Sequence, residues 1–294
     1  GFRKGALMMS LDIRHKEAEE FITIKSETGK IEKANLSLEI DDEFMMAVDT
    51  YYQTGEEVVL HEKRNYSGHE IEYDVYPIRL YKKMIATAHE WGEPGCLFTE
   101  RLRNYNIMQH VEDYSIETTN PCGEQPLPKH FCCNLGSLNL SEYVKNPYTD
   151  KATFDWDEFV KDIAIAVRAL DVILDENAER HPLPEQKDNS LKWRNIGLGV
   201  MGYGTALMQL SLTYGTKLAI EFTEGLFRTL FRAAVEASCA LAEEKGAFPC
   251  YTHKIWESEI MKVAYGEGKC WGKPLRNCSL ISVAPTGTIS NILG

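Results

Sequence analysis

The sequence lacks the features that mark membrane proteins and nucleic-acid-binding proteins. No apolar run approaches the roughly 18 residues needed to cross a bilayer, and no leader with a charged and then an apolar part opens the chain. The 32 Lys and Arg residues are outnumbered by 44 Asp and Glu, and they do not form the cationic clusters that bind a phosphate backbone. These absences exclude a membrane helix and argue against nucleic acid as a partner, so we expect a soluble, cytoplasmic protein.

Cysteine is too sparse for a disulfide scaffold. The eight cysteines are spread over 294 residues without a CxxC spacing, so most are expected to be reduced thiols. Tandem repeats and low-complexity linkers are also absent from the sequence. Because the chain opens without Met and stops just after a loop that leads into a helix, we expect a fragment that lacks both ends of a longer protein.

Helical and extended patterns alternate along the chain, which predicts an α/β architecture. Strands are expected over 5–13 and 33–40, each followed by a helix start, with a polar turn over 23–34 between them. Turn signals within 51–77 predict a hairpin inserted between helical pieces. Apolar residues at helical spacing predict further helices at 78–89, 156–179 and 217–245.

The stretch TNPCGEQPLPKHFCC holds three of the cysteines and predicts a functional site. Asn120, Cys122 and Glu124 are two residues apart, so in an extended backbone their side chains leave the same face. Pro121 biases Asn120 toward the extended region, and Gly123 has no side chain to block a ligand. An amide, a thiol and a carboxylate would then point together into one site.

Simple packing is the competing explanation, because a free cysteine is often only a small buried hydrophobic residue. Burying Asn120 and Glu124 without partners would cost roughly 1–3 kcal/mol for the amide and more for the charge, which favours a site. The spacing leaves three chemistries open at Cys122. They are acyl transfer with a histidine, metal binding, and redox or radical chemistry at sulfur.

Two of these chemistries lack part of their motif. His15 and Glu17 supply one half of a zinc deaminase motif, and Pro121–Cys122 begins the other half. Gln125 stands where the second thiolate is needed, so no metal is expected. None of the eight histidines lies in a recognisable hydrolase motif, although one could be close in space. A cysteine hydrolase or a thiol redox protein without a nucleotide substrate is kept as the alternative function.

Three further segments carry weaker signals. Cys132 and Cys133 place a second thiol within reach of the same pocket as part of a redox couple, although packing at a strand start also explains them. Residues 285–290, PTGTIS, suit an anion at a helix start, although a capping turn has the same composition. GLGVMG, starting at Gly197, satisfies GxGxxG, but no clear strand precedes it, so close helix packing is favoured over a dinucleotide site.

The order of several motifs resembles the large, catalytic subunit of ribonucleotide reductase. The similar segments are GFRKGALMMSLDIRH, KANLSLEIDDEFM, EPGCLFTERLRN, TNPCGEQPL, CNLGSLNL, RNIGLGVMGYG and APTGTISN. They cover nearly the whole chain, and NPCGE and PTGTIS most resemble the adenosylcobalamin-dependent branch. The resemblance implies a ten-stranded α/β barrel of the ribonucleotide reductase and glycyl radical enzyme type, with residues 1–294 as the central part of a single catalytic domain.

The resemblance also implies roles for the motif residues. Cys122 would form the thiyl radical that removes the 3′ hydrogen atom of the ribose. Glu124 would accept the proton of the 3′ hydroxyl, and Asn120 would hydrogen-bond the sugar hydroxyls. Cys133 matches the cysteine that gives electrons to the 2′ carbon while pairing with a thiol upstream of this chain, and Cys132 is an addition to the usual pattern. The implied reaction reduces ribonucleotides, expected to be ribonucleoside diphosphates, to deoxyribonucleotides.

The ligands and partners follow from the same resemblance. The implied substrate phosphate contacts are Thr286, Gly287, Thr288, Ile289 and Ser290. A deoxynucleotide or ATP effector is expected at the polar turn and the chain start, with contacts at Arg3, Lys25, Ser26 and Lys30. The radical is expected from adenosylcobalamin, with a separate metal-containing subunit as second choice. A thioredoxin- or glutaredoxin-like protein would supply electrons, and a homodimer is compatible with the resemblance.

Overall fold

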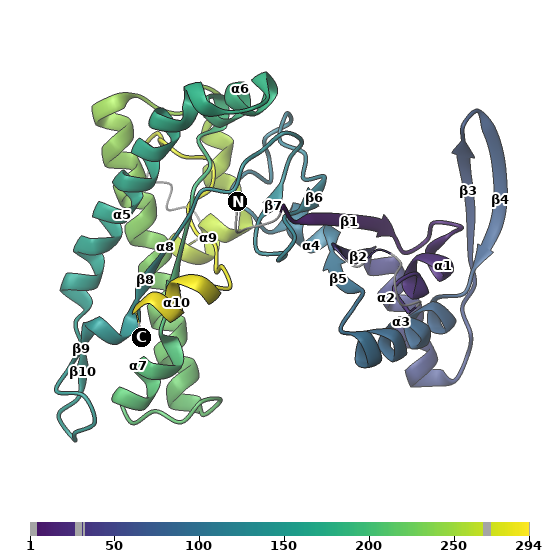
Figure 1. Ribbon diagram of the computed structural model, residues 1–294, viewed down its shortest axis with the longest axis horizontal. Coiled ribbons are helices and arrows are strands. Elements are labelled where there is room, and N and C mark those ends of the chain that lie inside the picture. The colour runs from purple at the N-terminus through teal and green to yellow at the C-terminus, as the bar shows by residue number, and fades with distance from the viewer. Residues whose placement is uncertain (1–4, 27–30, 32, 267–271, 294) are drawn as a thin grey trace. The chain divides into compact units, whose positions relative to one another are not determined.

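The chain divides into two compact units, each combining parallel strands with helices (Figure 1). The first unit comprises residues 1–104 and 118–123, and the second comprises residues 105–117 and 124–294. The predicted α/β class is therefore confirmed. The residues that the computed structural model describes are 5–26, 31, 33–266 and 272–293.

The first unit is built on a three-stranded parallel sheet of order β1–β2–β5. β1 (Leu7–Asp12) and β2 (Ala34–Ile40) confirm the two predicted strands, and β5 is Gly95–Phe98. β2 is the central strand, and its side chains at Leu36, Leu38 and Ile40 are buried in the core. The other elements of this unit outside the hairpin are α1 (Ala18–Thr23), α2 (Asp42–Thr54), α3 (Pro77–Trp91), α4 (Thr99–Asn104) and β6 (Thr118–Thr119).

An antiparallel hairpin lies between α2 and α3 in the sequence and extends from the rest of its unit (Figure 1). β3 (Leu60–Tyr66) pairs with β4 (His69–Val75), and the turn residues Ser67 and Gly68 have φ values of 54° and 89°. Positive φ at both positions gives the twist that a two-residue hairpin turn needs. The first four residues of the predicted 51–77 segment belong instead to the end of α2.

The second unit contains a buried parallel strand pair. β8 (Leu135–Asn139) pairs with β11 (Gly197–Met201), and Ile281 adds an isolated parallel bridge to Leu198. All five residues of β11 are buried, so this strand lies inside the core and not at an edge. The smaller strands of the unit are β7 (Pro126–Leu127), β9 (Val144–Lys145) and β10 (Thr153–Phe154).

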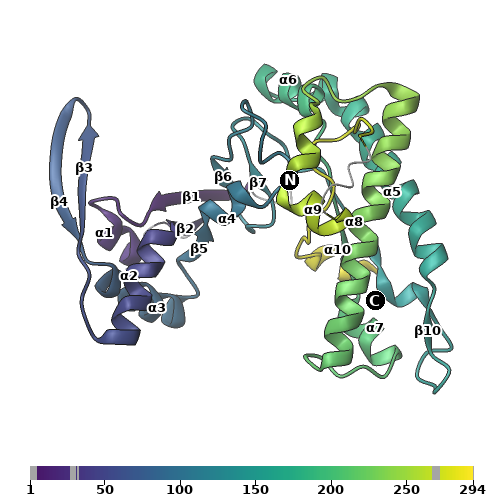
Figure 2. The same cartoon turned by 180° about the vertical axis from the view of Figure 1, so that it is seen from behind.

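Two long helices cover the core of the second unit and lie side by side in both views (Figure 1 and Figure 2). α5 (Trp156–Asn177) and α8 (Lys217–Lys245) confirm the two helices predicted from apolar spacing. Their inner faces bury Ile163 and Val167 of α5 and Leu230 of α8. The remaining helical segments are α6 (Pro184–Trp193), α7 (Tyr203–Gln209), α9 (Glu259–Tyr265), α10 (Gly287–Leu293), η1 (Leu140–Tyr143), η2 (Ala178–Arg180) and η3 (His253–Glu257). No helix in the described part of the chain is both long and apolar enough to span a membrane.

Candidate active site

Asn120 to Gly123 form a tight turn at the end of the first unit. The Gly123 amide donates a hydrogen bond to the Asn120 carbonyl at 3.0 Å, and Gly123 has a φ of 83°. Asn at the first position, Pro at the second and Gly at the fourth are residues that such a turn prefers. The extended backbone predicted for 120–124 is therefore wrong over its first four residues. The side-chain alternation of a strand does not apply to Asn120 and Cys122.

The turn leaves the Cys122 thiol exposed. A Cβ atom placed on Gly123 would meet no atom within 4 Å, so the approach to the turn is open. β6 connects the turn to its own unit, because Thr118 Oγ1 lies 3.1 Å from Ser10 Oγ of β1. Ser10 in turn donates to Glu39 Oε1 of β2 at 2.6 Å. An exposed thiol on an anchored turn is available for chemistry, whereas a cysteine used for packing would be buried.

Glu124 opens the next segment of the second unit. Its carbonyl oxygen accepts a hydrogen bond from Ser282 Oγ at 2.8 Å. Its side chain is half-buried, and the Oε2 atom is enclosed without a hydrogen bond from any described residue. Ser282 lies three positions before Pro285. One contact therefore joins the predicted general base to the run that leads into the predicted phosphate segment.

Two glycines of β11 allow this contact. A Cβ atom on Gly197 would lie 2.5 Å from Gln125 Nε2, and one on Gly199 would lie 2.2 Å from the Ser282 carbonyl oxygen. Both distances are too short for any side chain, so these strand positions need glycine where neighbouring segments cross them. The GLGVMG run is thus a buried strand in close contact with neighbouring chain segments, and the predicted helix packing is wrong.

β11 also holds the start of β8, next to the two adjacent cysteines. The Gly197 amide donates to the Asn134 carbonyl at 2.9 Å. Cys133 is exposed, whereas Cys132 is half-buried with its Sγ atom 3.7 Å from His181 Nδ1. Burial raises the pKa of the Cys132 thiol, which makes it less reactive near neutral pH. Cys133 is therefore the more accessible thiol of the pair.

Residues 285–290 leave the core and begin α10. Thr286 has a φ of 56°, and the Ser290 amide donates to its carbonyl at 2.9 Å. Thr288 and Ser290 are exposed, and Ser290 Oγ donates to the Gly287 carbonyl at 2.9 Å. The first amides of a helix have no acceptor within the helix, so the segment is compatible with the predicted phosphate contact.

The second unit therefore brings three parts of the predicted site together. Three segments make contacts close to Gly197 and Gly199. They are the backbone of Glu124, the backbone of Asn134, which follows Cys133, and the run that precedes residues 285–290. Asn120 and Cys122 belong to the first unit and are joined to Glu124 along the chain by Gly123.

The predicted effector contacts are only partly described. Arg3 and Lys30 lie outside the described residues. Lys25 forms an ion pair with Glu93, and its side chain is largely buried. Ser26 follows α1, and its amide donates to the Thr23 carbonyl at 2.9 Å. Lys25 is thus already paired within its own unit, so a phosphate would have to replace Glu93.

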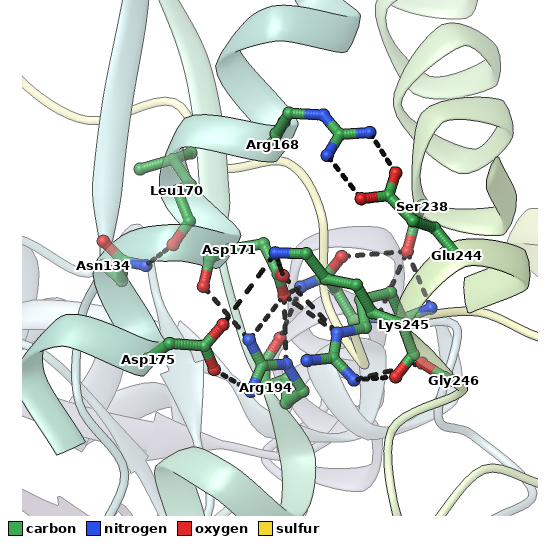
Figure 3. A network of polar contacts seen from close by, with 12 residues as sticks. Asn134, Arg168, Leu170, Asp171, Asp175, Arg194, Ser238, Glu244, Lys245 and Gly246 are labelled. Atoms are coloured by element: carbon green, nitrogen blue, oxygen red, sulfur yellow. Dashed lines mark hydrogen bonds and ion pairs between the residues drawn. The ribbon is translucent and has the colours of Figure 1, made fainter. Parts of the chain in front are cut away.

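A buried ionic network next to β11 is absent from the sequence-based predictions (Figure 3). Arg194 donates to Asp171 Oδ1 from Nε at 3.0 Å and from Nη2 at 2.8 Å, and to Asp175 Oδ1 at 2.7 Å. Asn277 Nδ2 donates at 3.1 Å both to Asp171 Oδ1 and to the Arg194 carbonyl. Burial alone would raise the pKa of the Asp171 carboxyl, but the Arg194 hydrogen bonds and charge hold it below its usual value.

The network fixes the segments on both sides of β11. Arg194 directly precedes Asn195, whose Nδ2 atom donates to the Cys132 carbonyl at 2.6 Å. Asn277 directly precedes the run from 278 to 282 that contacts Glu124. Sequence reasoning missed the network because Asp171 lies 23 positions from Arg194 and 106 from Asn277. The available signal was an arginine placed three residues before the apolar glycine run that starts at Gly197.

The whole chain, residues 1–294, matches the family model described as ribonucleotide reductase, barrel domain. The chain belongs to this family. The predicted family and its α/β barrel type are thereby confirmed. The strands that the structure describes do not close into a barrel, and they form part of this domain type.

Two relatives of this ribonucleotide reductase chain are named vitamin B12-dependent ribonucleoside-diphosphate reductase. One, from Mycobacterium tuberculosis (strain ATCC 25618 / H37Rv), is 35% identical over 100% of this chain and 38% of its own length. The other, from Thermoplasma acidophilum, is 34% identical over 100% of this chain and 35% of its own length. The chain therefore spans little more than a third of these relatives.

A solved structure shares the fold. The alpha subunit of the class Id ribonucleotide reductase from Actinobacillus ureae matches with a TM-score of 0.69 and 20% sequence identity. The match covers 98% of this chain and 47% of that subunit. At this identity the likeness concerns the fold alone.

Proposed function

We propose that this chain carries the catalytic centre of a ribonucleotide reductase that converts ribonucleoside diphosphates to 2′-deoxyribonucleotides for DNA synthesis. The observation that carries the proposal is the exposed Cys122 thiol on an anchored turn, two residues before a carboxylate. Membership of the ribonucleotide reductase barrel family supports the same reaction, as do the names of the relatives. Residues 1–294 would be the central part of a single catalytic domain.

The proposed mechanism assigns one step to each side chain. A radical on the Cys122 sulfur takes the hydrogen atom from the 3′ carbon of the ribose, and Asn120 hydrogen-bonds the sugar hydroxyls. Glu124 accepts the proton of the 3′ hydroxyl as a general base. The 2′ hydroxyl leaves as water, and Cys133 with a second thiol supplies two electrons and two protons while forming a disulfide; one proton goes to the leaving water and one to the 2′ carbon. Glu124 returns its proton to the 3′ oxygen, and Cys122 returns the hydrogen atom to the 3′ carbon, which restores the sulfur radical. The exposure of both Cys122 and Cys133 supports these roles.

The substrate diphosphate is proposed to bind at residues 285–290. The hydrogen bond from Ser282 to the Glu124 carbonyl supports this placement, because it holds the segment that leads into residues 285–290 against the backbone of the proposed base. The hydroxyls of Thr286, Thr288 and Ser290 would donate to phosphate oxygens together with the early amides of α10.

The radical is proposed to come from adenosylcobalamin. The exposed Cys122 sulfur and the open space around Gly123 fit a group that must reach the thiol from outside the chain, and these two residues would face it. The chemistry that adenosylcobalamin supplies when bound is an organic radical able to take a hydrogen atom from a thiol. A separate metal-containing subunit is the second candidate source. In the described part of the chain, no group of three or more His, Cys, Asp and Glu side chains could hold a metal ion.

Regulation and electron supply complete the proposal. A deoxynucleotide or ATP effector would bind near Lys25 and Ser26, where the ion pair between Lys25 and Glu93 would open to receive a phosphate. A thioredoxin- or glutaredoxin-like protein would reduce the disulfide at Cys133. We further propose a homodimer in the cytoplasm, where ribonucleotide substrates are available.

A cysteine hydrolase is less well supported. The thiol–imidazole contact of the second unit joins His181 to Cys132 and not to a residue of the TNPCGE motif. Burial raises the pKa of the Cys132 thiol, whereas an activated nucleophile needs a lowered pKa. This contact therefore does not make a reactive nucleophile.

Replacing the two central groups of the motif tests the proposal in the full-length protein. With nucleoside diphosphate, adenosylcobalamin and dithiothreitol, Cys122→Ser should form no deoxynucleotide, because serine cannot carry the sulfur radical. Glu124→Gln should retain a trace, since a general base contributes about 10²- to 10⁴-fold. Cys96→Ser is the control, because Cys96 is an exposed cysteine of β5 outside the motif. Product formation by Cys122→Ser at the parent rate would refute the assignment.

A further inference from the structure

A cavity of about 190 Å³ lies beside Glu124 in the second unit. Most of its lining is apolar, with Ile116 and Phe231 among the contributing side chains, but Glu124, Tyr114 and Ser279 also line it. The cavity is half-open, and it is lined by one carboxylate residue, by three residues that carry hydroxyl groups and by two that carry amides; besides Glu124, Tyr114 and Ser279 these are Tyr105, Asn106 and Gln125. This combination is unusual for a packing defect, which would be lined by apolar groups alone.

Two of these polar groups have no partner among the described residues. Glu124 Oε2 is enclosed and makes no hydrogen bond. The Tyr114 hydroxyl likewise makes none with a described residue, while its ring is held edge-on against Phe131 and Trp193 at centroid distances of 5.8 and 5.4 Å. Burial raises the pKa of Tyr114 well above its usual value, so its hydroxyl stays protonated and can donate.

The size and polarity of the cavity favour water as its occupant. A water molecule takes about 30 Å³ of liquid volume and needs roughly two to four polar partners, so this space holds several molecules. Glu124, Tyr114 and Ser279 offer acceptors and a donor for them. An enclosed carboxylate oxygen without any partner would lose its hydration, which is costly, and cavity water removes that cost.

We propose that ordered water in this cavity bridges the Tyr114 hydroxyl to Glu124 Oε2, and that Tyr114 is a positioning residue for the general base. The inference rests on the proposed function. Water on the enclosed Oε2 atom would fix the carboxylate and leave Oε1 to accept the substrate proton. Tyr114 does not touch the substrate in this arrangement and acts through the water and Glu124.

The Tyr114→Phe variant removes only the hydroxyl and keeps the packed ring. Its kcat should fall about 10- to 100-fold, because a misplaced catalytic group costs this much, while KM for the nucleotide stays close to that of the parent. Ile260→Phe, which adds a ring to the cavity lining, should displace water and lower kcat in the same way. The matched control is Tyr203→Phe, because the Tyr203 hydroxyl bonds Thr223 Oγ1 at 2.5 Å and does not line the cavity. Its kcat should stay within about twofold of the parent.

A structural measurement separates this inference from the proposed function. A high-resolution crystal structure of the full-length Cys122→Ser protein should show water hydrogen-bonded to Glu124 Oε2 and to the Tyr114 hydroxyl, and Tyr114→Phe should lose the bridge. A dry cavity, or a protein donor on Oε2, would overturn the inference whatever the activity. Full turnover by Tyr114→Phe would overturn the positioning role and leave the proposed function intact. Turnover by Cys122→Ser would overturn the proposed function and the catalytic role of Tyr114 with it.

Discussion

Replacing Gly199 by alanine tests whether close backbone contact places Glu124. The added Cβ atom would lie 2.2 Å from the Ser282 carbonyl oxygen, whereas ordinary contact begins near 3.4 Å. Ser282 or β11 must therefore move by about 1 Å, and a backbone oxygen cannot rotate aside as the end of a side chain can. The same shift would disturb the hydrogen bond from Ser282 to the Glu124 carbonyl.

The expected loss of stability follows from the buried position of β11. Overpacking a core by one methyl group costs about 1–3 kcal/mol, and we expect the upper end because the strand is fully buried and its neighbour is backbone. A loss of about 3 kcal/mol is large against a typical unfolding free energy of about 5–15 kcal/mol, yet it leaves the chain folded. The loss of activity should exceed the loss expected from the unfolded fraction alone, because a shift of Ser282 also displaces Glu124, to which it is hydrogen-bonded.

Urea unfolding followed by tryptophan fluorescence measures this effect, since Trp193 and Trp256 belong to the second unit. The control is Gly204→Ala in α7, where a Cβ atom would meet no other atom within 4 Å. Alanine is favoured over glycine in a helix by about 0.5–1 kcal/mol, so this variant should be neutral or more stable. A Gly199→Ala protein within about 0.5 kcal/mol of the parent would show that β11 does not need glycine there.

Two further predictions concern the cysteine pair and the buried network. Iodoacetamide should modify Cys133 faster than Cys132 in single-cysteine variants, because Cys133 is exposed while burial raises the pKa of the Cys132 thiol; equal rates would contradict this. Asp171→Asn should cost about 3 kcal/mol at pH 7, the lower end of the range for breaking a buried ion pair, because Arg194 would remain buried with only the partly exposed Asp175 as its charge partner. The pKa of Asp171 is lowered in the folded state, so its contribution is present above about pH 4 and is lost as the pH falls through the folded value. Urea titrations should therefore show a smaller gap between variant and parent at acid pH, and an unchanged gap would argue against the ion pair.

The sequence predicts this fold best where one period continues over many residues. The helix predicted over 217–245 has those bounds, and the one predicted over 156–179 ends two residues earlier, at Asn177. Such helices bury one face along their whole length, so the pattern of apolar residues records their packing.

The turn at Asn120–Gly123 shows how a local signal can be misread. A spacing of two residues suggested a strand, but Asn-Pro-Cys-Gly places each residue where a tight turn prefers it. The turn chemistry prevails because glycine reaches a φ of 83° without strain, and the closing hydrogen bond to Asn120 satisfies two backbone groups. The motif therefore singled out the candidate residues, while the backbone geometry that holds them required the structure.

The contacts that position the site could not be read from the sequence, because their partners are far apart along the chain. Ser282 and Glu124 are separated by 158 positions, and nothing in a serine or a glutamate as a residue type predicts that the two form a hydrogen bond. The glycines of β11 matched a dinucleotide fingerprint by spacing, yet their physical reason is the approach of Ser282 and Gln125. Only the structure shows which neighbouring segment occupies the space that a side chain at each glycine would fill.

Stability and catalysis should therefore be coupled through β11 in the second unit. The Gly197 amide holds the residue after Cys133, and Gly199 admits the backbone of Ser282, which holds Glu124. The network of Asp171, Arg194 and Asn277 fixes the segments that flank this strand. A change in the network should therefore move the Cys133 thiol and the Glu124 carboxylate together. A substitution of Ile163 on the buried face of α5, two helical turns before Asp171, would weaken packing without touching the network, which gives the two kinds of variant different activities at equal stability.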